Sequence, residues 1–295
     1  MFVEELERFA AAVSDPRCAA IAGRLVTPLC AAVTGRRGVG RSTVARALAR
    51  AGVTVTDSPT TADLTVRVLA DAVKPEDHAA IESAQRPTLV VLNKADLIKT
   101  SAAGRHPNTP STAARGRCAQ LAARAGVAVE PLAALLAVAE LDDSTWSALQ
   151  GADGEVVPAL DIVGTRQARA AIRRGASRAD VDALLRALSG IDGVVDKLCA
   201  LGAQPRYQRV LDAVAELETM AITDRRIGAF LSHDDTVIAR MEDAIAAATA
   251  AGIDVDRGDT ATHHLRRAVH WQRRPYGVDI ARGSLRLWSR AGGSV

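Results

Sequence analysis

The sequence predicts an α/β protein in which a mostly parallel sheet with flanking helices is followed by an α-helical domain. In the first half of the chain, short runs rich in Val, Leu and Thr alternate with longer stretches in which apolar residues recur at the spacing of a helix. Strands that alternate with helices form crossover units, which give a parallel sheet covered on both faces. After Gly151 the strand-like runs stop, and Ala, Leu, Arg and Asp recur at helical spacing.

Each element follows from a local pattern of apolar residues and of residues that begin or end helices. Pro16 suits the first turn of a helix, and Ser177 with Asp180 forms a capping-box pattern before an apolar run. Helices are expected over residues 2–13, 16–25, 42–50, 76–84 and 112–125. Strands are expected over residues 29–34, 53–56, 64–69, 89–92 and 127–129.

These patterns divide the chain into four parts. They are N-terminal helices (1–26), a sheet domain (27–150), a helical domain (151–262) and a basic tail (263–295). The helical domain carries 18 acidic and 13 basic residues, a net charge of −5, whereas the tail carries seven Arg and one Asp, a net charge of +6. The opposite charges favour a tail packed on the helical domain, and weak peripheral contact with an anionic membrane is the alternative.

Composition excludes several classes of protein. The 295 residues include 37 basic and 34 acidic ones, and a net charge of +3 is not that of a nucleic-acid-binding protein. The four cysteines lie far apart, and His263, His264 and His270 have no carboxylate or cysteine at ligand spacing, so we expect no disulfide or zinc site. We find no signal-peptide pattern and no apolar run long enough to span a bilayer. We therefore expect a cytoplasmic protein.

A glycine-rich turn lies between the first sheet strand and the next helix. It matches the phosphate-loop pattern G-x-x-x-x-G-K-[ST], except that Arg41 replaces the lysine. Glycines let successive N–H groups face a phosphate, and the helix N-terminus adds partial positive charge. Ser42 is expected to bind Mg²⁺ and Arg41 to face the β- and γ-phosphates, whereas a turn without a ligand is the alternative. The expected phosphate-binding residues are Gly35, Arg36, Arg37, Gly38, Val39, Gly40, Arg41, Ser42 and Thr43.

The fourth predicted strand ends in Asn93-Lys94-Ala-Asp96, an N-K-x-D pattern typical of guanine recognition. The Asp96 carboxylate would accept hydrogen bonds from N1–H and the exocyclic amine of guanine, which adenine does not offer. The Lys94 stem would lie along the base, and Asn93 would tie this loop to the phosphate loop. A plain solvated turn is the alternative, but a phosphate loop upstream favours the binding role.

The two motifs carry a family resemblance. Residues 25–48 resemble the opening of the P-loop GTPase domain of bacterial, especially actinobacterial, dynamin-like proteins, and residues 57–98 resemble that family's stretch from its D-x-x-G motif to its guanine motif. A looser similarity runs on to about residue 200. The resemblance implies a P-loop GTPase-like fold that binds GTP or GDP with Mg²⁺, which Asp57 would hold through water. It also implies that a backbone N–H at Ala133 or Ala134 contacts guanine O6.

The sequence departs from this family in the parts that drive hydrolysis. Thr60 stands at the glycine of D-x-x-G, and only 14 positions separate Thr43 from Asp57, which leaves no room for a switch loop and its Thr. Arg36 or Arg37 could replace the missing charge, but a solvated loop arginine is the simpler interpretation.

We therefore expect a guanine-nucleotide-binding protein with weak or no intrinsic hydrolysis. It would act through a partner, either a full-length dynamin-like GTPase or a second copy of itself. An active GTPase that converts GTP to GDP and phosphate is the alternative. A small-molecule kinase that uses ATP conflicts with the guanine-reading role of Asp96.

Overall fold

The computed structural model describes residues 1–98, 112–151 and 155–292. The chain forms two compact units, a helical unit of Met1–Leu29 with Ala200–Val295 and a sheet unit of Cys30–Cys199. This division differs from the one expected from the sequence. The N-terminal helices and the basic tail belong to the same unit as residues 200–262, whereas residues 151–199 belong to the sheet unit.

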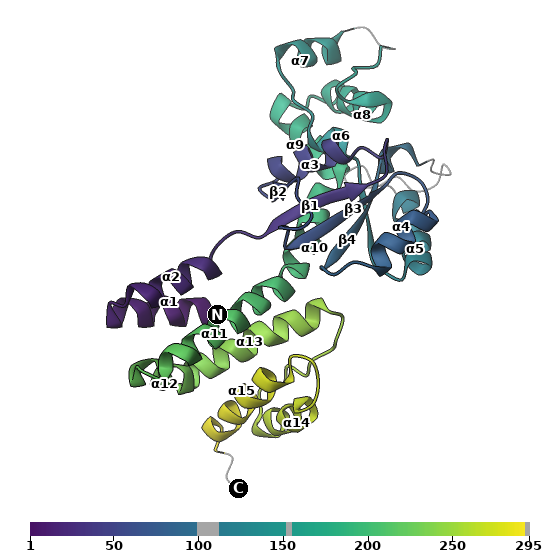
Figure 1. The fold of residues 1–295 in the computed structure, drawn as a ribbon. Coiled ribbons are helices and arrows are strands. Elements are labelled where there is room, and N and C mark those ends of the chain that lie inside the picture. The colour runs from purple at the N-terminus through teal and green to yellow at the C-terminus, as the bar shows by residue number, and fades with distance from the viewer. Residues whose placement is uncertain (99–111, 152–154, 293–295) are drawn as a thin grey trace. The chain divides into compact units, whose positions relative to one another are not determined.

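The sheet unit contains a five-stranded sheet in which every neighbouring pair of strands is parallel (Figure 1). The strand order is β2-β1-β3-β4-β5. The predicted parallel sheet is thus confirmed, with one strand displaced, because the fifth begins two residues later than its apolar run. The strands are β1 (Cys30–Gly35), β2 (Thr54–Thr56), β3 (Leu64–Leu69), β4 (Thr88–Asn93) and β5 (Val129–Leu132).

Helices cover both faces of this sheet. Ile81 of α4 (Pro75–Glu82) and Leu121 of α5 (Thr112–Ala125) pack with Val90 and Leu92 of β4 in one apolar cluster. The chain steps from β1 to β2 in one direction and from β3 to β4 and β5 in the other, so right-handed crossovers place α3 on the opposite face from α4 and α5. The helices are α3 (Arg41–Arg50), α4 (Pro75–Glu82), η1 (Ala95–Leu97), α5 (Thr112–Ala125), α6 (Ala134–Ala137), α7 (Asp143–Gln150), α8 (Asp161–Arg173), α9 (Arg178–Ser189) and α10 (Ile191–Leu201), which runs across the boundary between the units.

The helical unit joins the two ends of the chain in one core. Phe2 and Leu6 from the N-terminus are buried in the same cluster as Trp271 and Ile280 from the tail. The predicted packing of the tail on helices is therefore confirmed for residues 263–292, and residues 293–295 lie outside the described residues. The helices of this unit are α1 (Phe2–Val13), α2 (Pro16–Leu25), α11 (Ala203–Ala221), α12 (Arg225–Ser232), α13 (Asp234–Ala250), α14 (Ala261–Trp271) and α15 (Gly277–Arg290).

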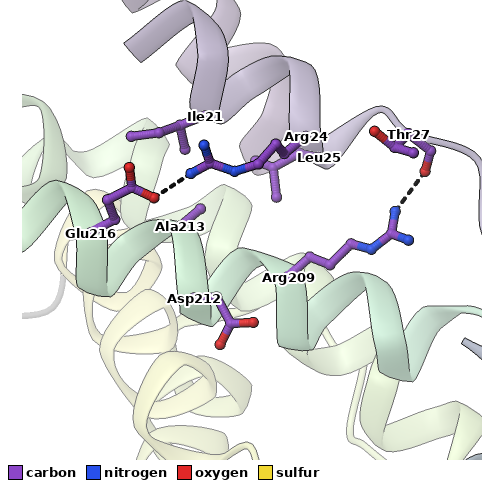
Figure 2. A pocket seen from close by; sticks show the side chains of 8 residues that line it. All are labelled: Ile21, Arg24, Leu25, Thr27, Arg209, Asp212, Ala213 and Glu216. Atoms are coloured by element: carbon purple, nitrogen blue, oxygen red, sulfur yellow. Dashed lines mark hydrogen bonds and ion pairs between the residues drawn. The ribbon is translucent and has the colours of Figure 1, made fainter. Parts of the chain in front are cut away.

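An open groove marks the place where α2 meets α11 in the helical unit (Figure 2). Ile21 of α2 and Ala213 of α11 give it an apolar lining, and Arg24 spans it to form an ion pair with Glu216. Exposed ion pairs contribute little to stability, so the apolar contacts carry most of this attachment. Within the described residues, none of the helices has both the length and the hydropathy needed to cross a membrane.

Candidate functional site

The sequence motifs meet at the carboxyl edge of the sheet. β1 ends in Gly35, the first residue of the glycine-rich turn, and β4 ends in Asn93. From β1 the chain crosses to β2 on one side, and from β3 it crosses to β4 on the other side, so the order of the strands reverses between β1 and β3. Open parallel sheets bind ligands at such a switch point, outside the carboxyl ends of the strands. The topology therefore places both motifs where this class of sheet offers a crevice.

The backbone of the turn takes positive φ values at three glycines, Gly35, Gly38 (φ +86°) and Gly40. Gly35 has φ +145° and Gly40 has φ +89°, and both values favour glycine. At Gly40 a Cβ atom would also lie 2.5 Å from the side-chain nitrogen of Asn93. α3 begins at Arg41 with no side chain capping its first turn in the described part of the chain, so its first amides stay available to an anion.

A cavity of about 520 Å³ opens beside this turn, within the size range of small-molecule sites. Arg37 and Arg41 bring positive charge to it, and Ser42 and Asp57 face the same space. A hydroxyl and a carboxylate on the same lining are a donor set that suits Mg²⁺, which takes one or two carboxylates together with the phosphate oxygens of a bound molecule. The lining is Val33, Arg37, Gly38, Gly40, Arg41, Ser42, Ala45, Val55, Thr56 and Asp57.

Arg36, which the sequence groups with the phosphate-binding residues, points elsewhere. Its Nε lies 3.0 Å from Oδ2 of Asp77, a fully buried carboxylate on α4. Arg67 of β3 holds the other oxygen, with Nη2 2.7 Å from Oδ1. Neither Asp77 nor Arg67 belongs to a recognisable motif, so sequence reasoning missed both. The only signal was an Asp three residues after Lys74 at a helix start.

The guanine-type motif is bonded to the phosphate loop through two side chains. Asn93 Nδ2 donates to the carbonyl oxygen of Val39 at 2.9 Å, and its Oδ1 accepts from the amide of Ala134 at 3.1 Å. Lys94 Nζ lies 3.5 Å from the carbonyl oxygen of Gly38. The expected tie between the two loops by Asn93 is therefore present, and the Lys94 stem extends from one loop to the other.

The amides of the loop after β5, which the resemblance assigns to guanine O6, are bonded within the protein. The amide of Ala133 donates to the carbonyl oxygen of Ser189 at 2.8 Å, and the amide of Ala134 donates to Asn93. Both N–H groups that the resemblance assigns to guanine O6 thus have protein partners in this structure. Ala133 and Ala134 act here as supports of Asn93 and of the loop itself.

Asp96 lies half-buried in the short helix η1. Burial raises the pKa of its carboxyl, and the negative charge of Asp161 raises it further, while Lys94 opposes both. Asp161 begins α8 with φ +58°, a rare backbone conformation for a residue with a side chain. No local pattern places Asp161 near the N-K-x-D motif, because 64 residues lie between Asp96 and Asp161.

The segment that replaces D-x-x-G is held by one hydrogen bond within itself and by two from Arg86. The hydroxyls of Ser58 and Thr60 lie 2.8 Å apart, and the Arg86 guanidinium donates to the carbonyl oxygens of Pro59 and Thr60 at 2.6 and 2.5 Å. Between α3 and β2 only residues 51–53 connect helix to strand. The expected lack of room for a switch loop before Asp57 is therefore confirmed.

Known proteins do not identify this site. A scan against protein-family models finds no match to the chain, and a search of curated proteins finds none either. Residues 1–98, 112–151 and 155–292 contain no group of three or more His, Cys, Asp or Glu side chains placed to hold a metal ion. The geometry of the sheet edge is therefore the basis for any functional assignment.

Proposed function

We propose that this protein binds guanine nucleotides, GTP or GDP with Mg²⁺, and that its sheet unit is related to the dynamin-like GTPases. One observation carries the proposal: Asn93 and Lys94 of the N-K-x-D motif bond to Val39 and Gly38 of the phosphate loop. A nucleotide places its base and its phosphates at two ends of one molecule. Two such motifs joined by side-chain bonds form a frame that suits both ends.

Each part of the frame has a separate task. The amides of the glycine-rich turn and of the first turn of α3 would bind the phosphates, with Arg37 and Arg41 balancing their charge. Ser42 and Asp57 would hold Mg²⁺, which neutralises phosphate charge when bound. The ionised Asp96 would accept two hydrogen bonds from guanine.

Replacing Asp96 by Asn is expected to remove the preference for guanine. Hydrogen bonds to a charged group contribute about 1.5–3 kcal/mol each, so the affinity for GDP should fall at least about tenfold. The affinity for ADP should stay unchanged, because adenine offers Asp96 no matching pair of donors. Isothermal titration of wild type and Asp96→Asn with GDP, GTP, ADP and ATP measures both quantities.

Asp143→Asn is a suitable matched control, because Asp143 is an exposed carboxylate of the same unit. It should bind GDP as the wild type does. Equal affinity of the wild type for GDP and ADP would remove the base-reading role of Asp96. No binding of any nucleotide would contradict the proposed function as a whole.

Affinity for GDP is also expected to depend on pH through Asp96. Guanine needs the carboxylate form, and burial raises the pKa of Asp96 above its usual range. GDP affinity should therefore weaken as the pH falls, and it should do so at a higher pH than an ordinary Asp would require. GDP titrations of wild type and Asp96→Asn from about pH 4 to about pH 8, which includes the carboxyl range, test this. A wild-type profile parallel to that of Asp96→Asn would contradict it.

We propose further that hydrolysis is weak or absent, in preference to an active GTPase. Phosphoryl transfer depends on positioned groups around the γ-phosphate. Thr60 is held by Arg86, Arg36 is held by Asp77, and no switch loop lies between α3 and β2. We expect a turnover below about 1 s⁻¹, the low end of common enzyme rates, in an assay of phosphate release from GTP. A higher rate that Arg41→Ala abolishes would favour the active enzyme.

A protein with this profile would act through a partner. We propose either a full-length dynamin-like GTPase or a second copy of this chain.

Weak peripheral contact with anionic lipid is proposed only for the outer faces of α14 and α15, where Val269 and Val278 are exposed. Sedimentation of the protein with GDP and with GTP measures self-association, and flotation with anionic vesicles at low and high salt measures the lipid contact.

A further inference from the structure

Among the described residues of the sheet unit, the carboxylate of Asp77 is the most completely buried charged group. It lies in the first turn of α4 with no exposed surface. Its Oδ1 accepts from Arg67 Nε at 3.2 Å and Nη2 at 2.7 Å, and its Oδ2 accepts from Arg36 Nε at 3.0 Å and from the amide of Lys74 at 3.2 Å. A buried carboxylate is stable only with such partners.

These bonds connect three elements at the carboxyl edge of the sheet. Arg67 lies on β3 opposite Thr34 of β1. Arg36 follows the last residue of β1 and is the second residue of the phosphate loop. Asp77 thus joins the start of the phosphate loop to β3 and to the first turn of α4.

The phosphate loop is thereby held at its start and in its middle. Arg36 holds its start, and the bonds from Asn93 and Lys94 hold the carbonyl groups of Val39 and Gly38. Glycines at three of its positions give the free loop many conformations, and ordering such a backbone costs free energy when a ligand binds. Anchors that order the loop beforehand remove part of that cost.

We propose that Asp77 is a positioning residue that holds the phosphate loop through Arg36, and that Arg36 does not bind phosphate itself. The ligand cations are then Arg37 and Arg41, whose side chains line the cavity. The expected effect of Arg36 on nucleotide affinity rests on the proposed function. Its effect on the ordering of the loop backbone without nucleotide does not. The two claims can therefore be tested separately.

The first test needs no nucleotide. Hydrogen–deuterium exchange of the loop amides, residues 35–42, is compared in wild type, Arg36→Gln and Arg37→Gln. We expect faster exchange in Arg36→Gln and wild-type exchange in Arg37→Gln, because of these two loop arginines Arg36 is the one that bonds to Asp77. Equal exchange in the three proteins would overturn the proposal. Arg36 keeps 27% of its side-chain surface exposed, so this variant does not disturb a closed core.

The second test is a double-mutant cycle in the affinity for GDP, with Arg36→Gln, Asp77→Asn and the double variant. We expect Arg36→Gln to weaken binding about tenfold in the wild-type background, which is 1.4 kcal/mol, and to have no effect once Asp77 is replaced. An equal loss in both backgrounds would show that Arg36 contacts the phosphate and would overturn the proposal. If wild type binds no nucleotide, the proposed function fails while the exchange test still decides the role of Asp77. If Asp77→Asn does not fold, the exchange test with the two arginine variants decides it.

Discussion

Replacing Asp77 by Ala is expected to destabilise the sheet unit by about 3–5 kcal/mol, the usual result when one partner of a buried ion pair is removed. The change leaves Arg36 and Arg67 facing each other without the carboxylate that both contact. It also removes the side chain that accepts from the Lys74 amide at the start of α4. Urea unfolding followed by hydrogen exchange of β3 measures the loss in the sheet unit separately from the helical unit.

Asp71→Ala is a suitable control, because this nearby carboxylate is largely exposed and its replacement should change the free energy of unfolding by less than about 0.5 kcal/mol.

The pH dependence of stability gives a second check on the role of Asp77. Burial alone would raise the pKa of Asp77, but the bonds from Arg67, the Lys74 amide and Arg36 outweigh it and lower the pKa. Asp77 therefore stabilises the fold above the usual carboxyl range, and this contribution is lost as the pH falls through the lowered pKa. The difference in stability between wild type and Asp77→Asn should narrow in acid; a constant difference would contradict the role of the charge.

Replacing Trp271 by Ala is expected to cost the helical unit about 3–5 kcal/mol, as for other large aromatic side chains removed from a core. Trp271 is 1% exposed and belongs to the cluster that contains Phe2 and Leu6 from the other end of the chain. A chain that ends at Thr262 loses α15 and all but the first two residues of α14, and we expect its helical unit not to fold. Circular dichroism during thermal unfolding measures both variants.

Val269→Ala provides the matched control on the same helix. Val269 is 63% exposed, so its truncation should change stability by less than about 0.5 kcal/mol. A stable helical unit in the chain that ends at Thr262 would show that the tail is an appendage and would strengthen the case for a membrane-binding segment. Loss of the helical unit would leave only the outer faces of α14 and α15 for such contact.

The local elements follow directly from the sequence. The helices at Phe2–Val13, Pro16–Leu25 and Thr112–Ala125 and the strand at Leu64–Leu69 have the predicted bounds. Ser177 caps α9 through the Asp180 amide at 3.2 Å, as its pattern predicts. The N-K-x-D motif that contains Asn93 was also predictable, because it consists of four adjacent residues at the end of a strand. These features depend on period, caps and turn residues, which a few adjacent positions carry.

Only the tertiary structure decided which distant segments share a core and which charged groups meet. It joined Phe2 to Trp271 in one unit, and it paired Arg36 with Asp77 across 41 positions. It also gave the amides of Ala133 and Ala134 partners inside the protein and brought Asp161 near Asp96. No periodicity encodes such encounters, because burial and ion pairing act through space between side chains that the chain order keeps apart. The sequence alone therefore determined the local elements named above and the two motifs, and the fold decided that Arg36 bonds to Asp77 while Arg37 and Arg41 line the cavity.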